Sequence, residues 1–595
     1  MLRNLKASAG AKWSALWADK RAFRTRLLLA ASCALGCAFT FVFFGPCELY
    51  LQNTGDMTFP FSLLAPVMAL AGLGVFAVLL AVLLLLRGKP FNYAVSLLFA
   101  VTLAGYLQGN FLNIDHGTLD GTSVTWQYYR GAMLKNLVVW MLVIGAVFLL
   151  MYFSRKLWTR TLEAVSLLLA AMQAVALISL MNTANLSALQ ERYLSTEGIF
   201  ELAPSQNVVF FLLDRCDRSY LDDLIAQHPE WEAELGGFTS YQDFTGSFSR
   251  TYASVTYLLT GVRDDDAAPF EIRKRDYFRR AWGRSSFLSD LHSTGCQVGL
   301  YSHVGDVVGE MDNVEGKIDN IGQSTVSYSR RIMLAKMLEL SAYRYAPEAL
   351  KPYFQLYTGD LDAVQAAPSG DLYQIDDPEF WARYRAQGLS VNADLTGCFR
   401  FYHLQGAHYP FNMGETAERV ETRWDPAGQH DQMVGNMEMI LQYLAELREK
   451  GVYDDTTVII STDHAADYPE WVGDDWTDTT QGLSRLDSPR LLPLLIKPAH
   501  ADTSRPMELS HKQICQDNLR ASIAGWFGLD TEQYGRTIES IGEDEEMTRT
   551  FWMLLYDEAL TTRDAYMGTY VIRGDGNDFS NWNLTQLTPL EPHVW

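Results

Sequence analysis

Five long apolar runs, all before residue 185, constrain the fold of this 595-residue chain more than any other feature. Each is close to the roughly 20 residues that a helix needs to cross a bilayer. A signal peptide would be one such run followed by a cleavage site. The runs therefore predict a five-helix transmembrane domain rather than a signal peptide or a set of buried core helices. They are Leu27–Phe44, Leu63–Leu86, Tyr93–Leu112, Leu137–Phe153 and Ala164–Met181.

Positive charges are unevenly divided among the segments that join these runs. The loop 45–61 has none, and the loop 113–136 has only Arg130 and Lys135 near its end. The positive-inside rule therefore places the N-terminus in the cytoplasm of a multi-pass cell-membrane protein. Five crossings then place the chain after Met181 on the extracytoplasmic side. The charges expected on the cytoplasmic side are Arg3, Lys6, Lys12, Lys20, Arg21, Arg24, Arg26, Arg87, Lys89, Arg155, Lys156 and Arg160.

Charge and cysteine content exclude several classes of function. Lys and Arg total 48 and Asp and Glu total 70, giving a net charge of −22 and an isoelectric point near 4.9. A nucleic-acid-binding protein needs a basic surface, which this balance does not provide. The seven cysteines have no zinc-site spacing, so we expect neither a thiolate metal site nor a disulfide framework.

The pattern changes after residue 206, where short apolar runs alternate with amphipathic stretches. Asn207–Asp214 and Thr457–His464 are typical of strands buried on both faces of a parallel sheet. We expect further strands at Gln297–Tyr301, Cys398–His403 and Leu491–Ile496, and a helix over Asn436–Lys450. Alternating strands and helices indicate an α/β domain, which binds ligands beyond the carboxyl ends of its strands.

Acids and histidines stand at those strand ends. Asp214, His403, Asp463 and His464 would converge on one sheet edge and could hold a divalent cation such as zinc or manganese. The alternative for each acid is an ordinary loop residue that caps the next helix. Asp217 has an undecided role, either as a ligand or as such a loop acid.

A candidate nucleophile lies in the stretch Ser247–Gly261. The apolar residues after Thr251 predict a short helix that Gly261 ends, with Thr251 at its N-terminus. A helix N-terminus favours anions, and a metal-bound hydroxyl there could attack phosphorus or sulfur. Spacing alone does not choose among Thr251, Ser249 and Ser254, and Thr251 could instead be only a helix cap.

These pieces, in this order, resemble the sulfatase-like branch of the alkaline phosphatase superfamily, especially the membrane lipoteichoic acid synthases and phosphoethanolamine transferases. Those proteins have five membrane helices followed by an exported catalytic domain, and the resemblance covers nearly all of the chain from Asn207 to about Leu529. The segments that carry it are Asn207–Asp214, Thr251–Val255 with Leu258–Gly261, Leu404–Pro410, Gly451–His464, Leu492–Pro498 and Ser510–His511.

The resemblance implies roles for seven residues. Thr251 would be the nucleophile, and His408 would bind the substrate phosphate or protonate the leaving group. His403 and His511 are weaker candidates for the same substrate pocket or for a second metal. A strand-end histidine packed in the core is the alternative for His403. The implied ligands of one divalent metal, manganese or zinc, are Asp214, Thr251, Asp463 and His464.

The chain also departs from the family pattern. Ala465 follows the histidine where the family has glycine, which matters if that position needs a positive φ. The first acid is Asp214, where the transferases often carry Glu. The motif from which sulfatases make their formylglycine nucleophile is missing, which argues against a true sulfatase.

The resemblance implies a membrane-bound phospho-head-group transferase. A phosphoglycerol or phosphoethanolamine group would pass from a membrane phospholipid to Thr251 and then to a cell-surface glycan or lipid. The alternatives are a sulfatase-like hydrolase, in which water replaces the acceptor, and a non-catalytic membrane regulator. We expect a membrane domain over 1–185, a connector over 186–206, a catalytic domain over 207–530 and a C-terminal extension over 531–595. One interpretation of the connector is a helix that lies on the membrane surface.

Overall fold

The computed structural model describes most of the chain. The described residues are 20–54, 57–114, 116, 124, 126–184, 192–263, 268–322, 327–356, 358–366, 371–465, 483–485, 491–557 and 565–590. They form two compact units, one of residues 1–189 with 326–366, and one of residues 190–325 with 367–595. Residues 326–366 were expected in the catalytic domain but group with the transmembrane helices.

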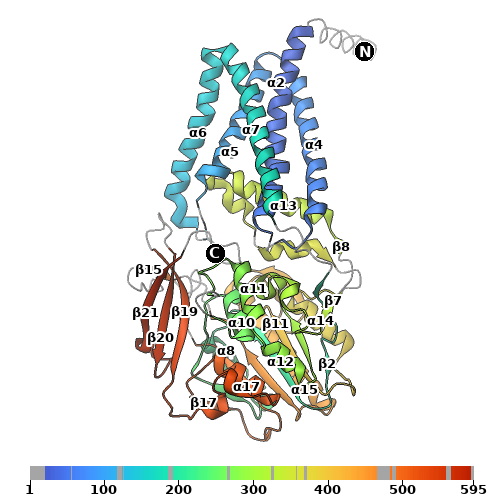
Figure 1. Ribbon diagram of the computed structural model, residues 1–595, viewed down its shortest axis with the longest axis vertical. Helices are drawn as coiled ribbons and strands as arrows, with labels where there is room; N and C mark the ends of the chain where they lie inside the picture. Colours follow the sequence, from blue (N-terminus) through green and yellow to red (C-terminus); the bar gives the residue numbers. More distant parts are fainter. Residues whose placement is uncertain are drawn as a thin grey trace. The chain divides into compact units, whose positions relative to one another are not determined.

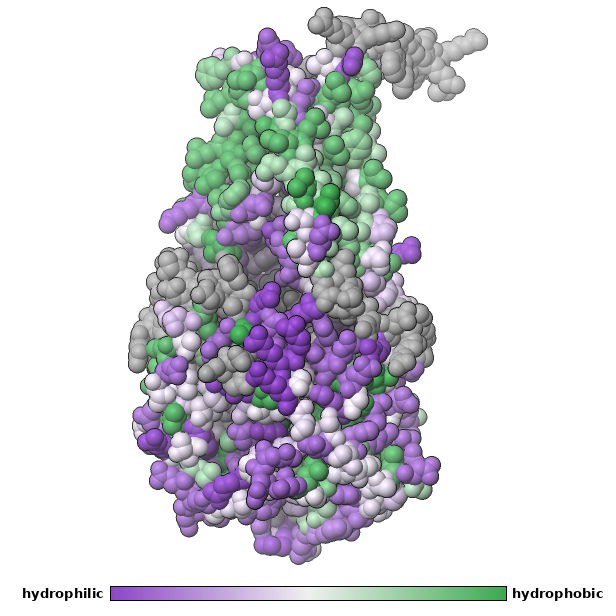
Figure 2. Space-filling view, viewed as in Figure 1, coloured by the Kyte–Doolittle hydropathy of each residue, from purple (hydrophilic) through white to green (hydrophobic). Residues whose placement is uncertain are grey.

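The described part of the first unit contains five helical spans long and apolar enough to cross a membrane, as the sequence predicts. Apolar side chains gather over them (Figure 2). Two interhelical hydrogen bonds, Thr40 to Gln173 (3.0 Å) and Trp158 to Ser96 (2.9 Å), join the spans internally. The first span consists of α2 (Lys20–Ala38), the π-helix η1 (Phe39–Phe44) and α3 (Gly45–Gln52); the others are α4 (Phe61–Leu85), α5 (Lys89–Leu107) with η2 (Gln108–Leu112), α6 (Arg130–Phe153) and α7 (Arg155–Thr183).

The re-entrant segment, residues 327–366, folds against these spans although it lies 140 residues further along the chain. Strands β8 and β9 pair antiparallel and close the segment at its base. Glycines on the spans make room for it, because a Cβ at Gly109 would lie 2.4 Å from the ring of Tyr345. Its elements are β8 (Ser327–Tyr328), α13 (Arg330–Tyr345), η6 (Glu348–Phe354), η7 (Thr358–Val364) and β9 (Gln365–Ala366).

Within the described residues, the second unit is built on a seven-stranded mixed sheet in the order β17-β4-β16-β14-β3-β11-β6. Figure 1 labels β11 and β17 of this sheet. The four strands from β14 to β6 run parallel, and β3 is buried along its whole length, as its continuous apolar run predicts. The strands are β3 (Asn207–Leu213), β4 (Thr239–Tyr241), β6 (Cys296–Tyr301), β11 (Gly397–Leu404), β14 (Thr456–Ser461), β16 (Leu494–Lys497) and β17 (Glu508–Ser510).

Helices complete the core of this unit. The apolar positions of α15, among them Met437, Ile440 and Leu444, are buried in the main hydrophobic cluster with the strands, as the 3.6-residue spacing predicts. The principal helices are α8 (Arg218–Gln227), α10 (Thr251–Thr260), α11 (Lys274–Arg284), α12 (Phe287–Ser293), α14 (Asp377–Gln387), α15 (Pro426–Glu449) and α17 (Gln516–Trp526).

Two regions at the ends of this unit add short sheets. The described part of the expected connector, 192–206, holds strands β1 (Tyr193–Leu194) and β2 (Glu201–Leu202) rather than a surface helix. The C-terminal extension supplies β19 (Thr548–Asp557), β20 (Ala565–Arg573) and β21 (Trp582–Pro589), which form an antiparallel sheet with β15 (Leu483–Arg485) from the expected catalytic domain.

Candidate active site

Two buried carboxylates lie at the carboxyl edge of the central sheet, after neighbouring strands. Asp214 follows β3 and Asp463 follows β14, and the register pairs Leu212 with Ser461, so both acids stand two residues beyond a paired position. The backbone N–H of Arg215 links them, because it donates to Asp463 Oδ1 over 3.1 Å. Arg215 has a φ of 61°, and backbone strain of this kind is concentrated at functional sites.

His464 completes a set of ligands that fits a divalent cation. Its Nε2 atom lies 3.5 Å from Asp463 Oδ2 and 3.9 Å from Asp214 Oδ1. These two oxygens are buried and accept no hydrogen bond from the described residues, which is costly unless a cation binds there. The other ring nitrogen of His464 faces the carbonyl of Ala465 over 3.3 Å. Because a carbonyl only accepts, Nδ1 carries the proton and Nε2 keeps the lone pair that a metal needs.

The protonation of the two acids also favours a cation. Burial and the neighbouring Asp463 carboxylate raise the pKa of Asp214 well above its ordinary value. Burial opposes ionisation of Asp463 too, but the imidazoles of His464 and His403 hold its pKa below the ordinary value. Two carboxylates this close repel each other when both are ionised, which disfavours the doubly negative state of the pair. A bound cation would remove that conflict.

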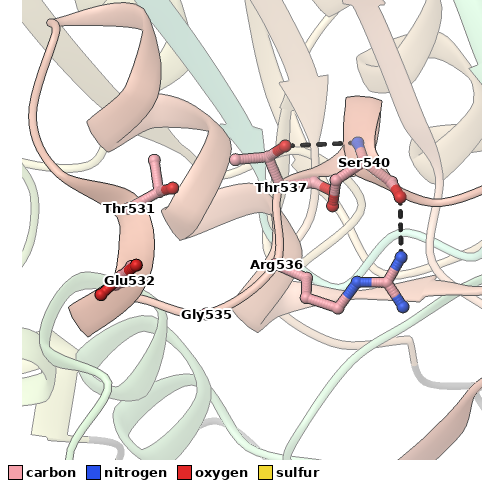
Figure 3. Close-up of a pocket in the computed structure, with 6 residues that line it drawn as sticks. All are labelled: Thr531, Glu532, Gly535, Arg536, Thr537 and Ser540. Atoms are coloured by element: carbon pink, nitrogen blue, oxygen red, sulfur yellow. Dashed lines mark hydrogen bonds between the residues drawn. The ribbon is translucent and has the colours of Figure 1, made fainter.

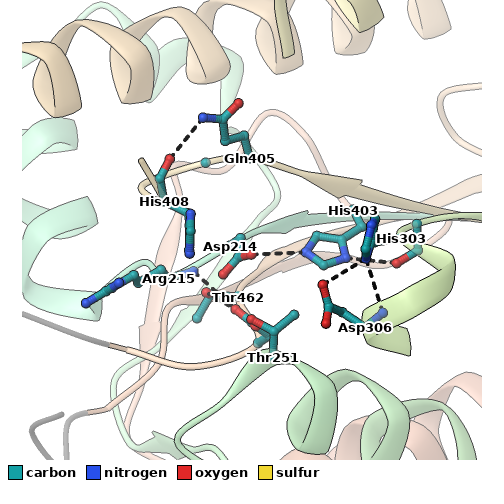
Figure 4. Close-up of polar contacts among 12 residues, drawn as sticks. Asp214, Arg215, Thr251, His303, Asp306, His403, Gln405, His408 and Thr462 are labelled. Carbon is teal, nitrogen blue, oxygen red and sulfur yellow. Dashed lines mark hydrogen bonds and ion pairs between the residues drawn. The ribbon is translucent and has the colours of Figure 1, made fainter. Parts of the chain in front are cut away.

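Thr251 lies beside this group at the first position of α10 (Figure 4), and its Oγ1 atom is 3.3 Å from His464 Nε2. The helix begins there, so free backbone N–H groups favour an anion at the same place. It ends at Gly261 with a φ of 68°, as the sequence predicts. The hydroxyl therefore stands next to the proposed ligands and at an anion-binding helix end.

The structure separates Thr251 from the other candidate residues of its stretch. Ser254 is buried, donates to the backbone carbonyl of Asp463 over 2.5 Å and accepts from Gln516 over 2.9 Å, so it holds the loop. Ser249 is buried as well. Asp217 caps α8 by accepting the N–H of Ser219 over 2.7 Å, which is the loop-acid alternative rather than a ligand.

His408 is held by a tight turn after β11. Gly406 has a φ of 58°, and a Cβ there would lie 2.6 Å from the carbonyl carbon of Leu213, so only glycine allows this loop to pass the end of β3. Burial and the nearby Arg215 guanidinium lower the pKa of His408 to about 4. Its Nδ1 is 2.5 Å from the carbonyl of Tyr409 and therefore carries the proton, which leaves Nε2 as a base.

His403 lies in β11 behind the first acid. Its Nε2 is 3.4 Å from Asp214 Oδ2, and its Nδ1 is 2.8 Å from the hydroxyl of Ser302. Burial lowers its pKa to about 4, so the neutral ring donates to Asp214 and accepts from Ser302. Its ring therefore orients Asp214 and is buried in the strand.

A second charged group borders the site, and the sequence analysis did not select it. His303 follows β6, and its Nδ1 is 2.8 Å from Asp306 Oδ2 in the π-helix η4 (Val304–Val308) (Figure 4). Lys274, on α11, lies 2.5 Å from the other oxygen of Asp306. Despite burial, Lys274 and His303 hold the pKa of Asp306 well below its ordinary value. This group places a lysine and a carboxylate of opposite charge near His403.

One residue of this second group could be predicted from the sequence. His303 comes two residues after the strand Gln297–Tyr301, so the strand-end rule that selects Asp214 and Asp463 also selects it. Arg215 is adjacent to Asp214 but has no periodicity or motif to mark it. Lys274 is one of several charges on α11, and only the fold brings it to Asp306.

Two other positions from the sequence analysis have clear placements. His511 is exposed, and its backbone N–H donates to Glu543 over 2.9 Å; among the described residues no contact joins its side chain to the carboxylates. Ala465 is buried and is not among the described residues with a positive φ. Alanine therefore fits the position where the family has glycine.

Two further features of the second unit are poorer candidates. Glu415, His430 and Asp431 form another set with metal-ligand atoms, but it is largely exposed and Arg423 already pairs with Asp431 over 2.6 Å. A surface hollow of about 470 Å³ is lined by Thr531, Glu532, Gly535, Arg536, Thr537 and Ser540 (Figure 3). The guanidinium of Arg536 there is paired with Glu545.

Solved structures of the kinds expected from the sequence are similar to the chain. A phosphonate monoester hydrolase from Silicibacter pomeroyi is 14% identical, with 64% of this chain and 88% of that one covered and a TM-score of 0.36. The lipoteichoic acid synthase LtaP from Listeria monocytogenes is 10% identical, with 61% and 85% covered and a TM-score of 0.33. The C-terminal periplasmic domain of EcEptC from Escherichia coli, in complex with Zn, is 12% identical, with 59% and 89% covered and a TM-score of 0.35.

No protein-family model and no curated protein sequence matches the chain. At these identities and TM-scores, the assignment of chemistry rests on the residues of the site. The five apolar spans followed by an α/β unit are those that the sequence predicts.

Proposed function

We propose that this chain is a membrane-bound, metal-dependent phospho-head-group transferase that works through a phospho-threonine intermediate. One observation carries the proposal: the Thr251 hydroxyl lies 3.3 Å from His464 Nε2, beside two buried carboxylates with unsatisfied oxygens. Asp214, Asp463, His464 and Thr251 would hold one divalent cation, manganese or zinc. Such a cation polarises phosphoryl oxygen and lowers the pKa of a bound hydroxyl.

In the first half-reaction, Thr251 Oγ1 attacks the phosphorus of a membrane phospholipid. The Oγ1–P bond forms as Oγ1 loses its proton, the bond from phosphorus to the diacylglycerol oxygen breaks, and that oxygen takes up one proton and leaves as diacylglycerol, so the proton lost by Thr251 balances the one gained by the leaving group. The head-group phosphate, phosphoglycerol or phosphoethanolamine, stays on Thr251. The N-terminus of α10 favours the phosphate charge at this position.

In the second half-reaction, an acceptor hydroxyl attacks the same phosphorus and Thr251 is regenerated. The acceptor is a cell-surface glycan or lipid. The acceptor hydroxyl loses its proton as the new P–O bond forms, and Thr251 Oγ1 takes up one proton as the Oγ1–P bond breaks; the unprotonated Nε2 of His408 would carry the proton between them. Arg215 and the Lys274–Asp306–His303 group place charge around the site that a phosphate contacts.

The membrane spans support a lipid donor. A domain tethered to the bilayer reacts with lipid without having to find it by free diffusion, which reduces the entropic cost of the encounter. Under the positive-inside assignment, the catalytic unit faces the extracytoplasmic side, where surface glycans and lipids are exposed.

The test is intact-mass analysis of the full chain in lipid nanodiscs that contain phosphatidylglycerol and phosphatidylethanolamine, with added Mn²⁺ or Zn²⁺. We expect an added mass of one head-group phosphate that peptide mapping assigns to Thr251. Thr251→Ala should abolish the adduct. Thr260→Ala should keep it, because Thr260 lies at the other end of the same helix, where its hydroxyl donates to the Thr256 carbonyl over 2.7 Å and accepts the Val262 N–H over 3.3 Å.

The remaining outcomes separate the alternatives. Release of free head group by the wild-type chain without an acceptor, lost in Thr251→Ala, would assign a hydrolase. Full transfer activity in Thr251→Ala would eliminate the phospho-threonine mechanism. Neither adduct nor turnover with either metal would favour a non-catalytic regulator.

A further inference from the structure

The re-entrant segment is fastened to the transmembrane spans by a buried polar network. Glu348 is fully buried, and its carboxylate accepts from Gln108 Nε2 over 2.9 Å and lies 3.0 Å from His116 Nε2. Lys351, also buried, donates to Asn113 Oδ1 over 2.7 Å. Glu348 contributes a backbone bond as well, because its N–H donates to Asn136 Oδ1 over 3.0 Å.

These contacts place η6 at one end of the helical bundle. Gln108 and Asn113 stand where the third span ends, and Asn136 is in the first two turns of the fourth span, α6. A second attachment at the same end joins the loop before α4 to the segment, because Thr58 Oγ1 donates to the carbonyl of Leu361 over 2.9 Å. The segment therefore lies at the boundary of the apolar region of the spans.

The exposure pattern of η6 is the reverse of that expected for a helix on a water-soluble surface. A 3₁₀-helix has three residues per turn, so Glu348 and Lys351 share one face and Leu350 and Tyr353 share another. The charged face points inward, whereas Leu350 is 46% exposed and Tyr353 is 78% exposed. Both apolar side chains thus face outward at the end of a membrane bundle.

The outer surface of α6, the span that holds η6, is also apolar. Leu134 is 65% exposed and Val138 is 52% exposed, on the side of the helix away from Asn136, the residue that bonds to η6. In a transmembrane helix, such side chains face lipid. Tyrosine is enriched where the hydrocarbon region meets water, because its ring is apolar and its hydroxyl is polar.

We propose that η6 is an interfacial membrane anchor, in which Leu350 and Tyr353 insert into the lipid surface while the Glu348–Lys351 face locks the segment to the bundle. The occupant of the outward face is the lipid bilayer, argued from the attachment of η6 at the ends of two apolar spans, one of which, α6, exposes apolar side chains on its outer side. The inference concerns membrane contact alone and does not depend on the catalytic chemistry.

The test uses an environment-sensitive nitrobenzoxadiazole label on the full chain in nanodiscs. Leu350→Cys and Tyr353→Cys carry the label, and Leu509→Cys, an exposed apolar position in the second unit, serves as the control. The unsubstituted chain gives the background from native cysteines. Quenching is measured with aqueous iodide and with lipid that carries a nitroxide near its glycerol backbone.

We expect labels at 350 and 353 to be quenched several-fold more by the nitroxide lipid than the control label, and several-fold less by iodide. Iodide quenching equal to the control at both positions would overturn the anchor, because the face would then be in water. Protection from iodide without quenching by lipid would also overturn it, and would assign the face to a protein contact. Two labelled positions keep the test decisive if one variant does not fold.

Discussion

Asp377 shows how one buried residue supports the catalytic loop from outside the site. Its two carboxylate oxygens accept the N–H groups of Gln405 over 2.7 Å and Gly406 over 3.0 Å, in the turn that precedes His408. Burial raises the pKa of Asp377 to about 6, although these hydrogen bonds favour the charged form. The loop geometry therefore depends on a carboxylate that is costly to ionise.

This pKa shift predicts a pH dependence of stability. The folded-state pKa is raised, so the folded chain binds the proton more tightly than the unfolded chain. The stabilising contribution of the protonated Asp377 carboxyl is complete below about pH 4 and is lost as pH rises through about 6. A shift of about two units corresponds to about 3 kcal/mol. Between pH 4 and 7, the unfolding free energy of the wild type should fall by about this amount relative to Asp377→Asn.

The measurement is thermal unfolding of the two proteins at matched pH values, monitored for the unit that contains the site. The comparison cancels every titrating group that the two share. A stability difference that stays constant from pH 4 to 7 would contradict the assignment. Because Asn replaces one acceptor with a donor opposite the Gly406 N–H, we also expect lower transfer activity in Asp377→Asn at pH 7.

At the residue scale, the sequence reveals those site residues that have a positional rule. Asp214, Asp463 and His464 follow continuous apolar strands, and Thr251 begins a helix that glycine ends. These local signals survive folding because the parallel sheet aligns its strand ends. Lys274 has no local signal, since its role depends on an ion pair with Asp306 across 32 residues.

Element boundaries were predicted less well than element types. The helix expected to begin at Asn436 begins at Pro426, because Asp425 caps it by accepting the Gly428 N–H over 2.7 Å and proline suits the first helical turn. The strand expected to begin at Leu491 begins at Leu494, since Pro493 has no N–H for the ladder. It pairs antiparallel with β14. Caps and proline thus decide these ends.

The buried polar network around Glu348 predicts that the re-entrant segment loses structure locally when this acid is removed. Glu348→Ala would leave Lys351 buried without its counter-charge, and burial already lowers the pKa of Lys351 to about 8. Breaking a buried pair in this way costs about 3–5 kcal/mol. We expect faster hydrogen exchange and proteolysis over residues 343–356, measured by mass spectrometry on the full chain.

Two variants control this prediction. Glu339→Ala removes one of the two acidic partners of the partly exposed Lys336 on α13, a pair worth about 0–1 kcal/mol, and should leave the segment protected because Asp360 still pairs with Lys336. Adding Lys351→Met to Glu348→Ala should restore part of the protection, because the uncompensated charge is gone. Equal exchange in Glu348→Ala and Glu339→Ala would show that the network does not hold the segment.

For the whole molecule, the sequence predicts five membrane spans and an α/β unit but not how the chain divides between its two compact units. Residues 326–366 contain no long apolar run, and their charged residues are typical of solvated surface. Glu348 and Lys351 become buried only through polar side chains that the spans provide more than 200 residues earlier. Contacts between side chains so far apart along the chain produce no periodic pattern in a single sequence.

The division into two units predicts that metal binding stabilises only one of them. A ligand that binds only the folded state adds about 2.7 kcal/mol at 100 times its dissociation constant. Adding Mn²⁺ or Zn²⁺ to chelator-treated protein should therefore raise the melting transition of the unit with Asp214, Asp463 and His464, and leave the transition of the helical unit in place. Asp463→Asn should abolish the shift. Glu415→Gln, in the exposed set, should retain it. A shift lost equally in both variants, or present in the helical unit, would mean that the cation binds elsewhere.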